Sequence, residues 1–534
     1  MRGAVEPAGR DGQGSPPAEL FILEPERRLS ESALWSLQRR WYERLGVDAW
    51  RTSTVPYHAT NNAFLARAYA EVIVGFLRDC AAAGADPAEP VHVVELGAGC
   101  GRFAFLLLRA LEALLGRETR AGLPPLRYVM TDFAASNLSF VRDHDALRPF
   151  VARGLLDFAL FDAKEDAALH LLGAGTTIGR GALGNPVVVI ANYIFDSLPQ
   201  DAFAVRDGAL FETVVALRSD RPALDPDDPE PFRGVVTEAS ERPAPSPVYP
   251  EPELERILRG YAGAPGAAAV LFPVTTLRCL RRLSDLSGGR LLLLTADKGE
   301  VDARLARAAG KSSISVHGSV SMPVDFHAVA EHFRHRGGRA FTTSFRHTSL
   351  AVSAYVEGAH PTAHDETRSA FDRAVERAGP DDLFTLWRGL DPDGLDPTAL
   401  LALLRLAQWD LDVLLTCLPR DRARLRDAPA STRAELGRAA HRAWEGYYHL
   451  GEPRDAAFEL ALLLFTLSDA EASLAFFERS RRLYGDHPRT LWNLGLCHAV
   501  AGRADEAATH LAEAVRLDPT IDVEAGLLPK TAGG

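Results

Sequence analysis

The chain has 534 residues, of which 47% are hydrophobic and 24% are charged, so it has an ordinary globular composition and room for several domains. Its formal net charge of −12 argues against a nucleic-acid-binding surface, which requires clustered lysine and arginine. The five cysteines are scattered without a CxxC pair, which argues against both a disulfide framework and a metal site.

The N-terminal segment gives no sign of targeting. Residues 1–20 are rich in glycine, proline and alanine and lack an apolar core, so we expect them to be disordered and to form neither a signal peptide nor an anchor. The longest aliphatic runs, such as residues 291–294, are too short to span a bilayer. These features predict a cytoplasmic protein without a membrane partner.

Strand and helix patterns alternate through the first two thirds of the chain. Apolar spacing predicts helices at 31–45, 61–80, 102–115, 135–143, 251–261, 275–286 and 325–337, and strands at 91–96, 127–131, 155–161, 187–192 and 290–296. This alternation predicts an α/β fold with a Rossmann-like, doubly wound parallel sheet. Two further strands, at 339–345 and 348–355, are too close together for a crossover helix and should form an antiparallel pair.

An extension follows the strand at 187–192. Residues 202–217 read as a hairpin, and an acidic, proline-rich insertion follows at about 218–255. The insertion fits either a roof over a substrate pocket or a disordered loop. We expect residues 21–358 to form one domain that contains it.

The strand signal ends near Gly358, and residues 366–520 are helical throughout. Residues 366–450 form a connecting helical region, while residues 454–521 show a 34-residue period. Small residues such as Gly495 and Ala507 fall where the tetratricopeptide repeat has them. The resemblance implies an all-α stack with a concave surface that binds a protein or peptide partner.

A glycine loop follows the first predicted strand. The run VHVVELGAGCGRF ends its strand near Glu95 and continues with Gly97, Gly99 and Gly101. Arg102 stands where the dinucleotide-binding fingerprint G-x-G-x-x-G has its third glycine, so the pattern is G-x-G-x-G instead. We expect a ligand to lie against this bare backbone. The simpler alternative is a tight turn without a ligand.

Acidic residues end the next two strands. Asp132 and Asp162 follow the strands at 127–131 and 155–161, and ligands of open α/β sheets bind at such strand ends. Asp157 competes with Asp162 but lies early in its strand. Either of the two strand-end aspartates can instead cap a helix.

The glycine pattern opened by Glu95 resembles the first motif of class I S-adenosylmethionine-dependent methyltransferases. The resemblance implies S-adenosyl-L-methionine as the cofactor, with its methionine and ribose over the glycine loop. It also implies Asp132 as the ligand of the ribose hydroxyls and Asp162 as the ligand of the adenine amino group. The segment YHATNN, with Tyr57 and Asn61, stands where this fold commonly builds part of its cofactor lid.

Two later segments, ANYIFDSLP at 191–199 and VDFHAVA at 324–330, resemble the MidA-type methyltransferase family. That family methylates a protein arginine, so the resemblance implies a protein substrate and makes Asn192, Asp196 and Asp325 the catalytic candidates. The alternative for the first two is a turn-forming pair at a strand end. Tyr193 replaces an acidic residue of the family and removes a carboxylate that would neutralise a guanidinium.

Three functions remain open at this point. The first is methyl transfer to a protein side chain, the second is methyl transfer to a small molecule such as a secondary metabolite, and the third is a catalytically inactive adaptor. Methyl transfer requires mainly alignment and exclusion of water, so no nucleophile–base set is expected. His58 and His327 lie nearest the candidate site and can be general bases or structural residues.

Overall fold

A computed structural model describes residues 20–55, 57–116, 122–223, 225, 228, 230–263, 268–302, 315–316, 320–345, 350–358 and 364–521. The expected disorder of the N-terminus concerns residues that lie outside these ranges, apart from Leu20. The chain divides into two compact units. Unit 1 contains Met1–Arg44, Asp196–Arg278 and Gly299–His332, and unit 2 contains Leu45–Phe195, Cys279–Lys298 and Phe333–Gly534.

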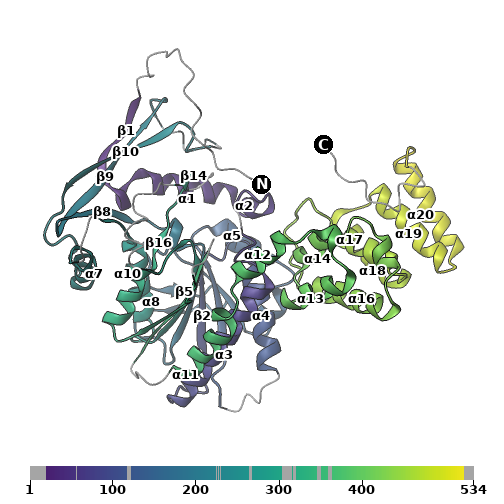
Figure 1. Ribbon diagram of the computed structural model, residues 1–534, viewed down its shortest axis with the longest axis horizontal. Coiled ribbons are helices and arrows are strands. Elements are labelled where there is room, and N and C mark those ends of the chain that lie inside the picture. Colours follow the sequence, from purple (N-terminus) through teal and green to yellow (C-terminus); the bar gives the residue numbers. More distant parts are fainter. Residues whose placement is uncertain are drawn as a thin grey trace. The chain divides into compact units, whose positions relative to one another are not determined.

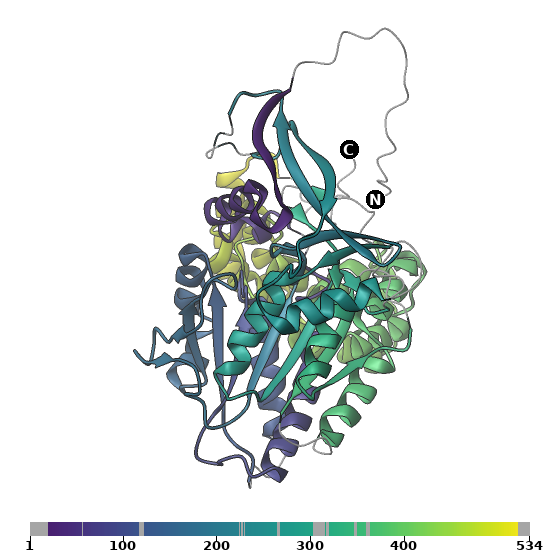
Figure 2. The same cartoon turned by 90° about the vertical axis from the view of Figure 1, so that its left-hand side faces the viewer.

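The centre of unit 2 is a seven-stranded sheet (Figure 1). In spatial order its strands are β4 (Leu156–Leu160), β3 (Leu126–Asp132), β2 (Val91–Leu96), β7 (Val187–Asn192), β12 (Leu291–Asp297), β18 (Ala351–Glu357) and β17 (Arg339–Thr342). The first five are parallel, while β18 runs antiparallel to both β12 and β17. This order confirms the predicted Rossmann-like sheet with an antiparallel final pair, and Figure 2 shows its strands side by side.

Both faces of this sheet are buried. The adjacent residues Val93 and Val94 of β2 point to opposite faces, and each is 0% exposed. Parallel strands covered on both faces read as continuous apolar runs, which explains why the sequence pattern located them. The unit also contains α2 (Asp48–Arg51), α3 (Ala63–Ala82), α4 (Arg102–Leu115), α5 (Ala135–Asp143), α6 (Arg148–Ala152) and the short strands β5 (Leu169–His170) and β6 (Thr177–Ile178).

In the C-terminal part of unit 2, the regular elements of the described residues from 364 to 521 are all helices, joined by turns and loops. Its elements are α11 (Asp365–Phe371), the π-helical η3 (Asp372–Glu376), α12 (Pro380–Gly389), η4 (Pro392–Gly394), α13 (Pro397–Leu406), α14 (Leu411–Cys417), α15 (Ala423–Arg426), α16 (Ala430–Glu445), α17 (Ala456–Thr466), α18 (Ala470–Tyr484), α19 (Pro488–Val500) and α20 (Ala504–Leu517). A core dominated by leucine and alanine side chains runs from α12 to α20.

The last four helices form two hairpins. The Ser473 hydroxyl of α18 donates to the Ala461 carbonyl of α17 at 2.8 Å. A Cβ atom added to Gly495 would lie 2.6 Å from Cγ of Leu511, so α19 and α20 approach closely at this glycine. The helices lie where the repeat pattern predicts them, and their assignment as tetratricopeptide repeats stays a prediction.

Unit 1 is built on an antiparallel sheet. Its strands are β1 (Phe21–Arg28), β9 (Ala209–Ser219), β8 (Asp201–Arg206) and β11 (Ala268–Phe272) in spatial order, with β10 (Val235–Pro243) also paired to β9. Its other elements are η1 (Leu29–Glu31), α1 (Ala33–Leu45), η2 (Phe195–Ser197), α7 (Pro252–Ala262), α8 (Val274–Asp285), α10 (Phe326–His335) and the short strands β13 (Gly299–Glu300), β14 (Ser315–Val316), β15 (Val320–Ser321) and β16 (Val324–Asp325); α1, η2, α8 and α10 cross the unit boundaries.

This sheet confirms the hairpin expected at 202–217, and within the insertion it orders residues 235–243 as a strand. The strand β10 lies within the insertion and pairs with β9 from Val235 opposite Ser219 to Pro243 opposite Phe211. The strand at 21–28 was not predicted, because Pro25 and the charged residues around it hide a strand whose register shifts at this point.

A buried carboxylate joins three strands of unit 1. Glu212 of β9 is 1% exposed and accepts from Nε of Arg28 at 2.6 Å and from Nε of Arg242 at 2.8 Å. The two arginines come from β1 and β10, so one anion holds both strands to β9.

None of the helices that the structure describes is both long and apolar enough to cross a membrane.

Gly75 of α3 tests the close approach of two helices. A Cβ atom there would lie 2.7 Å from the carbonyl oxygen of Glu366 in α11, and backbone cannot easily move aside. We expect Gly75→Ala to lower the free energy of unfolding by about 1–3 kcal/mol, measured by urea unfolding of the full chain. The control is Gly437→Ala in α16, where the nearest atom lies at 3.9 Å, and this variant should gain up to about 1 kcal/mol. Equal stability of the two variants would contradict the described packing.

Candidate active site

The glycine loop connects β2 to α4. Its three glycines have φ angles of +60° at Gly97, +54° at Gly99 and +82° at Gly101, which other residues adopt only with strain. Added Cβ atoms would lie 2.9 Å from Cδ1 of Ile194, 2.6 Å from Cζ2 of Trp50 and, at Gly101, 2.8 Å from Cγ1 of Val141 and 2.9 Å from Oη of Tyr448. Backbone conformation and internal packing are sufficient to require the glycines, so the contact of a ligand with this loop stays a prediction.

Asp132 ties this loop to the neighbouring strand. Its side chain, at the end of β3, accepts from the Gly99 amide at 3.0 Å and from the Ala134 amide at 2.8 Å. The amide of Asn137, which the sequence did not single out, adds a contact at 3.3 Å. Burial raises the pKa of Asp132, while these donors favour the charged form. The loop and the carboxylate predicted to bind the ribose are thus in direct contact.

Glu95 lies at the end of β2 and is 5% exposed. Its Oε2 atom has no hydrogen-bond partner among the described residues. Burial raises the pKa of Glu95 to about 8, and the nearby charge of Asp132 acts in the same direction. The carboxyl group is therefore largely protonated at neutral pH. Cys100, one residue before Gly101, is 1% exposed, and burial raises the pKa of its thiol to about 11, as suits a packing residue.

Two aspartates in or just after β4, Asp157 and Asp162, accept hydrogen bonds from nearby backbone amides. Asp162 accepts from the Lys164 amide at 2.9 Å and so caps a turn, and no helix begins there, which corrects the helix-cap alternative for this residue. Asp157 is 4% exposed and accepts from the amides of Gly173 at 2.7 Å and Ala174 at 3.0 Å. The contact of Asp162 with an adenine ring stays a prediction.

Asn192 ends β7 with its side-chain orientation fixed. Its Oδ1 atom accepts from the Tyr69 hydroxyl at 3.0 Å and from the Ala296 amide at 3.1 Å. Because a backbone amide can only donate, this contact identifies the oxygen of the side chain. The Nδ2 atom is buried and has no hydrogen-bond partner among the described residues. Asn192 therefore has a hydrogen-bond donor, and not an acceptor, to offer a ligand.

The residue after Asn192 has an uncommon backbone conformation. Tyr193 has a φ of +50°, and its ring centroid lies 5.8 Å from Nζ of Lys298. Asp297, at the end of β12, is 0% exposed and accepts from the Phe195 amide at 2.8 Å. Strained backbone at a strand end is frequent at functional sites. Sequence reasoning overlooked Asp297 and Tyr69, although the end of a predicted strand was a signal for the aspartate.

The other two catalytic candidates belong to unit 1. Asp196 is 3% exposed and accepts from the Ser197 hydroxyl at 2.9 Å. Asp325 accepts from the Tyr261 hydroxyl at 2.5 Å and from the Ala328 amide at 3.0 Å, so it caps α10, and burial raises its pKa. The three predicted catalytic residues are divided between the two units, and their catalytic role stays a prediction.

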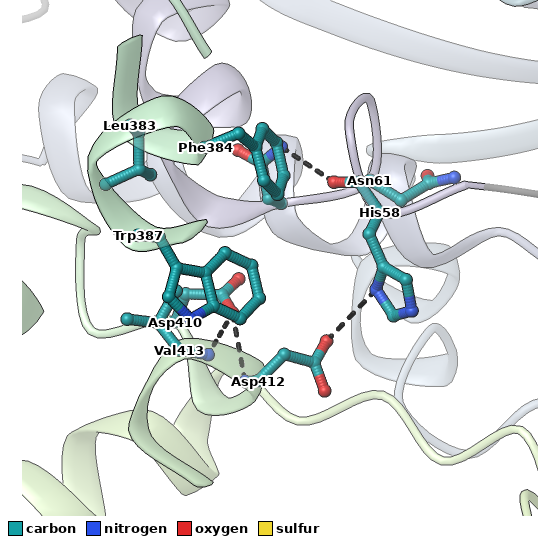
Figure 3. A pocket seen from close by; sticks show the side chains of 9 residues that line it. His58, Asn61, Leu383, Phe384, Trp387, Asp410, Asp412 and Val413 are labelled. Atoms are coloured by element: carbon teal, nitrogen blue, oxygen red, sulfur yellow. Dashed lines mark hydrogen bonds and ion pairs between the residues drawn. The ribbon is translucent and has the colours of Figure 1, made fainter. Parts of the chain in front are cut away.

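The predicted lid segment contacts the helical region. Tyr57 is 8% exposed and stacks on His58 with ring centroids 4.3 Å apart, and burial raises its pKa to about 12. Asn61 and His58 line a small cavity between α3, α12 and α14 (Figure 3). Its volume of about 10 Å³ suits one water molecule and excludes a cofactor. Nδ1 of His58 also lies 3.4 Å from a carboxylate oxygen of Asp412, which favours a structural role for His58 over a general base. The His327 ring packs edge-on against the Tyr261 ring.

Comparison with solved structures finds distant likenesses. A candidate methyl transferase from Burkholderia thailandensis, solved with bound S-adenosyl-homocysteine, is 16% identical with a TM-score of 0.37, over 60% of this chain and 75% of that one. Magnesium protoporphyrin IX methyltransferase from Synechocystis PCC 6803, also with bound S-adenosyl-homocysteine, is 12% identical with a TM-score of 0.27. The match covers 60% of this chain and 99% of that one. No protein-family model and no curated protein matches. At such TM-scores the likenesses have no bearing on activity, and the fold assignment rests on the strand order.

Glu95 predicts a pH dependence of stability. The folded protein keeps a proton up to about pH 8 that the unfolded chain releases near the ordinary value of 4.5. The free energy of unfolding should therefore fall by up to about 1.4 kcal/mol per pH unit between these values, relative to Glu95→Gln. Urea unfolding from pH 5 to 8 measures the difference. Glu165→Gln, at an exposed position, is the control and should follow the wild type. Parallel profiles of wild type and Glu95→Gln would contradict the raised pKa.

Proposed function

We propose that this chain is an S-adenosylmethionine-dependent methyltransferase. The proposal rests on one arrangement at the carboxyl edge of the sheet. The strand β2 lies between β3 and β7, so its glycine loop is flanked by Asp132 on one side and by Asn192 on the other. Asp132 is hydrogen-bonded to the loop itself, and Asn192 has a buried donor without a partner in the part of the chain that the structure describes. Open α/β sheets bind their ligands at this edge.

The side chains present fit the cofactor. Oδ1 of Asp132 accepts from the Ala134 amide and keeps a second lone pair for a ribose hydroxyl, whereas Oδ2 already accepts from the Gly99 amide and from the Asn137 side chain, whose longer contact of 3.3 Å can give way to a second hydroxyl. Among the described residues, Nδ2 of Asn192 is a buried donor without a protein partner, as expected where a bound molecule or water completes the hydrogen bond. When bound, S-adenosylmethionine supplies a methyl group on a positively charged sulfur. The protein's tasks are to align the acceptor and to exclude water.

The acceptor is proposed to be a protein side chain, with the helical hairpins binding the protein that carries it. The Nδ2 group of Asn192 can donate a hydrogen bond to the substrate. It can therefore orient a substrate atom that has a lone pair, such as a carbonyl oxygen or a neutral nucleophile that receives the methyl group. It does not suit the N–H groups of a guanidinium, which are themselves donors. This property and the replacement of an acidic residue by Tyr193 both disfavour arginine as the methylated residue.

An inactive adaptor is the second candidate function, and one observation favours it. The Trp50 ring already packs against Gly99, where the resemblance puts the cofactor close to backbone. If the ring keeps this place at all times, the loop serves only the fold. Cofactor binding decides between the two functions.

Calorimetric titration of the full chain with S-adenosylhomocysteine tests the cofactor site. We expect binding in the micromolar range, and Asp132→Ala should weaken it by about 10- to 100-fold, because hydrogen bonds to a carboxylate are lost. Asp145→Ala, at an exposed position in the loop after α5, is the matched control and should bind as wild type. No binding by folded wild-type protein would remove the methyltransferase and leave the adaptor.

Asn192→Asp tests the transfer step separately. The variant keeps an oxygen for Tyr69 and Ala296 but replaces the Nδ2 donor by an acceptor. We expect the dissociation constant for S-adenosylhomocysteine to change by less than about threefold. Incorporation of tritiated methyl groups into proteins of a cell extract should fall by about tenfold or more, since a positioning contact is lost. Undiminished incorporation would exclude Asn192 from acceptor binding.

A further inference from the structure

A segment of the helical region packs against the glycine loop within unit 2. This segment, Gly446–Gly451, connects α16 to α17 and is called the strap here. Its Tyr448 is 1% exposed and stacks on His144, with ring centroids 3.8 Å apart and planes 9° apart. The Tyr448 hydroxyl is one of the atoms that a Cβ at Gly101 would meet, at 2.9 Å, and it has no hydrogen-bond partner among the described residues.

Backbone contacts fix the strap at two further points. The carbonyl of His449 contacts Nε2 of His144 at 2.8 Å, and the carbonyl of Leu450 accepts from Nε of Arg51 at 2.7 Å. Arg51 directly follows Trp50, the residue whose ring packs against Gly99. The strap therefore supports the loop at two glycines. Tyr448 packs near Gly101, and Leu450 holds Arg51, whose neighbour Trp50 packs against Gly99.

An ion pair adds a third contact from the helical region. Arg102, which follows Gly101 and begins α4, donates from Nη2 to Oδ2 of Asp412 in α14 at 2.9 Å. The Arg102 side chain is only 10% exposed. Burial alone would lower the pKa of Arg102, but Asp412 and Asp410 outweigh this effect and raise it. Burial would raise the pKa of Asp412, and Arg102 instead holds it below its ordinary value.

The pair is difficult to replace in this position. A buried arginine that loses the carboxylate of Asp412 keeps only the more distant charge of Asp410 as compensation, so neutralising Asp412 requires a response nearby. The nearest backbone able to respond is the glycine loop, because Arg102 is covalently next to Gly101. Figure 3 shows Asp412 with its other partner, His58, at the edge of the small cavity.

From these contacts we infer that the helical region is part of the cofactor site. Asp412 and Tyr448 are positioning residues, which hold the glycine loop in its binding conformation through Arg102 and Gly101. The inference rests on the proposed function, because it concerns the affinity for S-adenosylmethionine. Its consequence is that the C-terminal helices are required for cofactor binding as well as for any partner.

Asp412→Asn in the full chain is the direct test. We expect the dissociation constant of S-adenosylhomocysteine to rise about tenfold, and KM for S-adenosylmethionine to rise with it while kcat changes little, because the loop and not the acceptor is misplaced. Asp412→Glu keeps the charge and should restore most of the affinity. The matched control is Glu435→Gln, which neutralises an exposed ion pair with Arg405 between α13 and α16, at 2.8 Å. It should bind within about twofold of wild type.

The outcomes separate the inference from the proposed function. Wild type that binds S-adenosylhomocysteine, with Asp412→Asn binding equally well, overturns the inference and leaves the methyltransferase intact. Folded wild type that does not bind removes both. If Asp412→Asn does not fold, Arg51→Ala replaces it, since the Arg51 side chain is 37% exposed and its loss frees Leu450 of the strap. A dissociation constant about threefold or more above wild type supports the inference, and an unchanged one overturns it.

Discussion

The hydrogen bond from the Gly99 amide to the Asp132 carboxylate is the constraint on which the rest of the candidate site depends. It joins the loop after β2 to the end of β3, and the same carboxylate accepts from the Ala134 amide on its other side. Because the carboxylate is buried, losing either of these donors would remove part of the hydrogen bonding that compensates for its desolvation. The loop is therefore held in one conformation before any ligand arrives, and Trp50 and Tyr448 pack against that conformation.

The sequence predicted the parts of the fold whose signals are local. The strands at 91–96 and 187–192 were found with the bounds they have, because parallel strands buried on both faces are continuous apolar runs. The strands at 21–28 and 235–243 were missed or taken for possible disorder. They are stabilised by a buried carboxylate on another strand, Glu212, and their own residues are mostly exposed. No window of the sequence contains that information.

The candidate site divides in the same way. Glycines, Glu95 and Asp132 were visible as a motif at strand ends. The partner of Asn192 is Tyr69, which is 123 residues away, and the ion pair of Arg102 spans 310 residues. Such contacts decide what each side chain can do. Asn192 is a donor only because Ala296 and Tyr69 both occupy its oxygen, and this fact bears on the acceptor more directly than the motif that drew attention to the residue.

The most direct test of the central claim is a crystal structure of the full chain with S-adenosylhomocysteine. The account predicts electron density along the Gly97–Gly101 loop, with both ribose hydroxyls within hydrogen-bond distance of Asp132 and with Tyr448 still behind the loop. Density at any other place, or a loop that keeps its packing and remains without ligand at saturating concentration, would contradict the assignment of this edge of the sheet as a cofactor site.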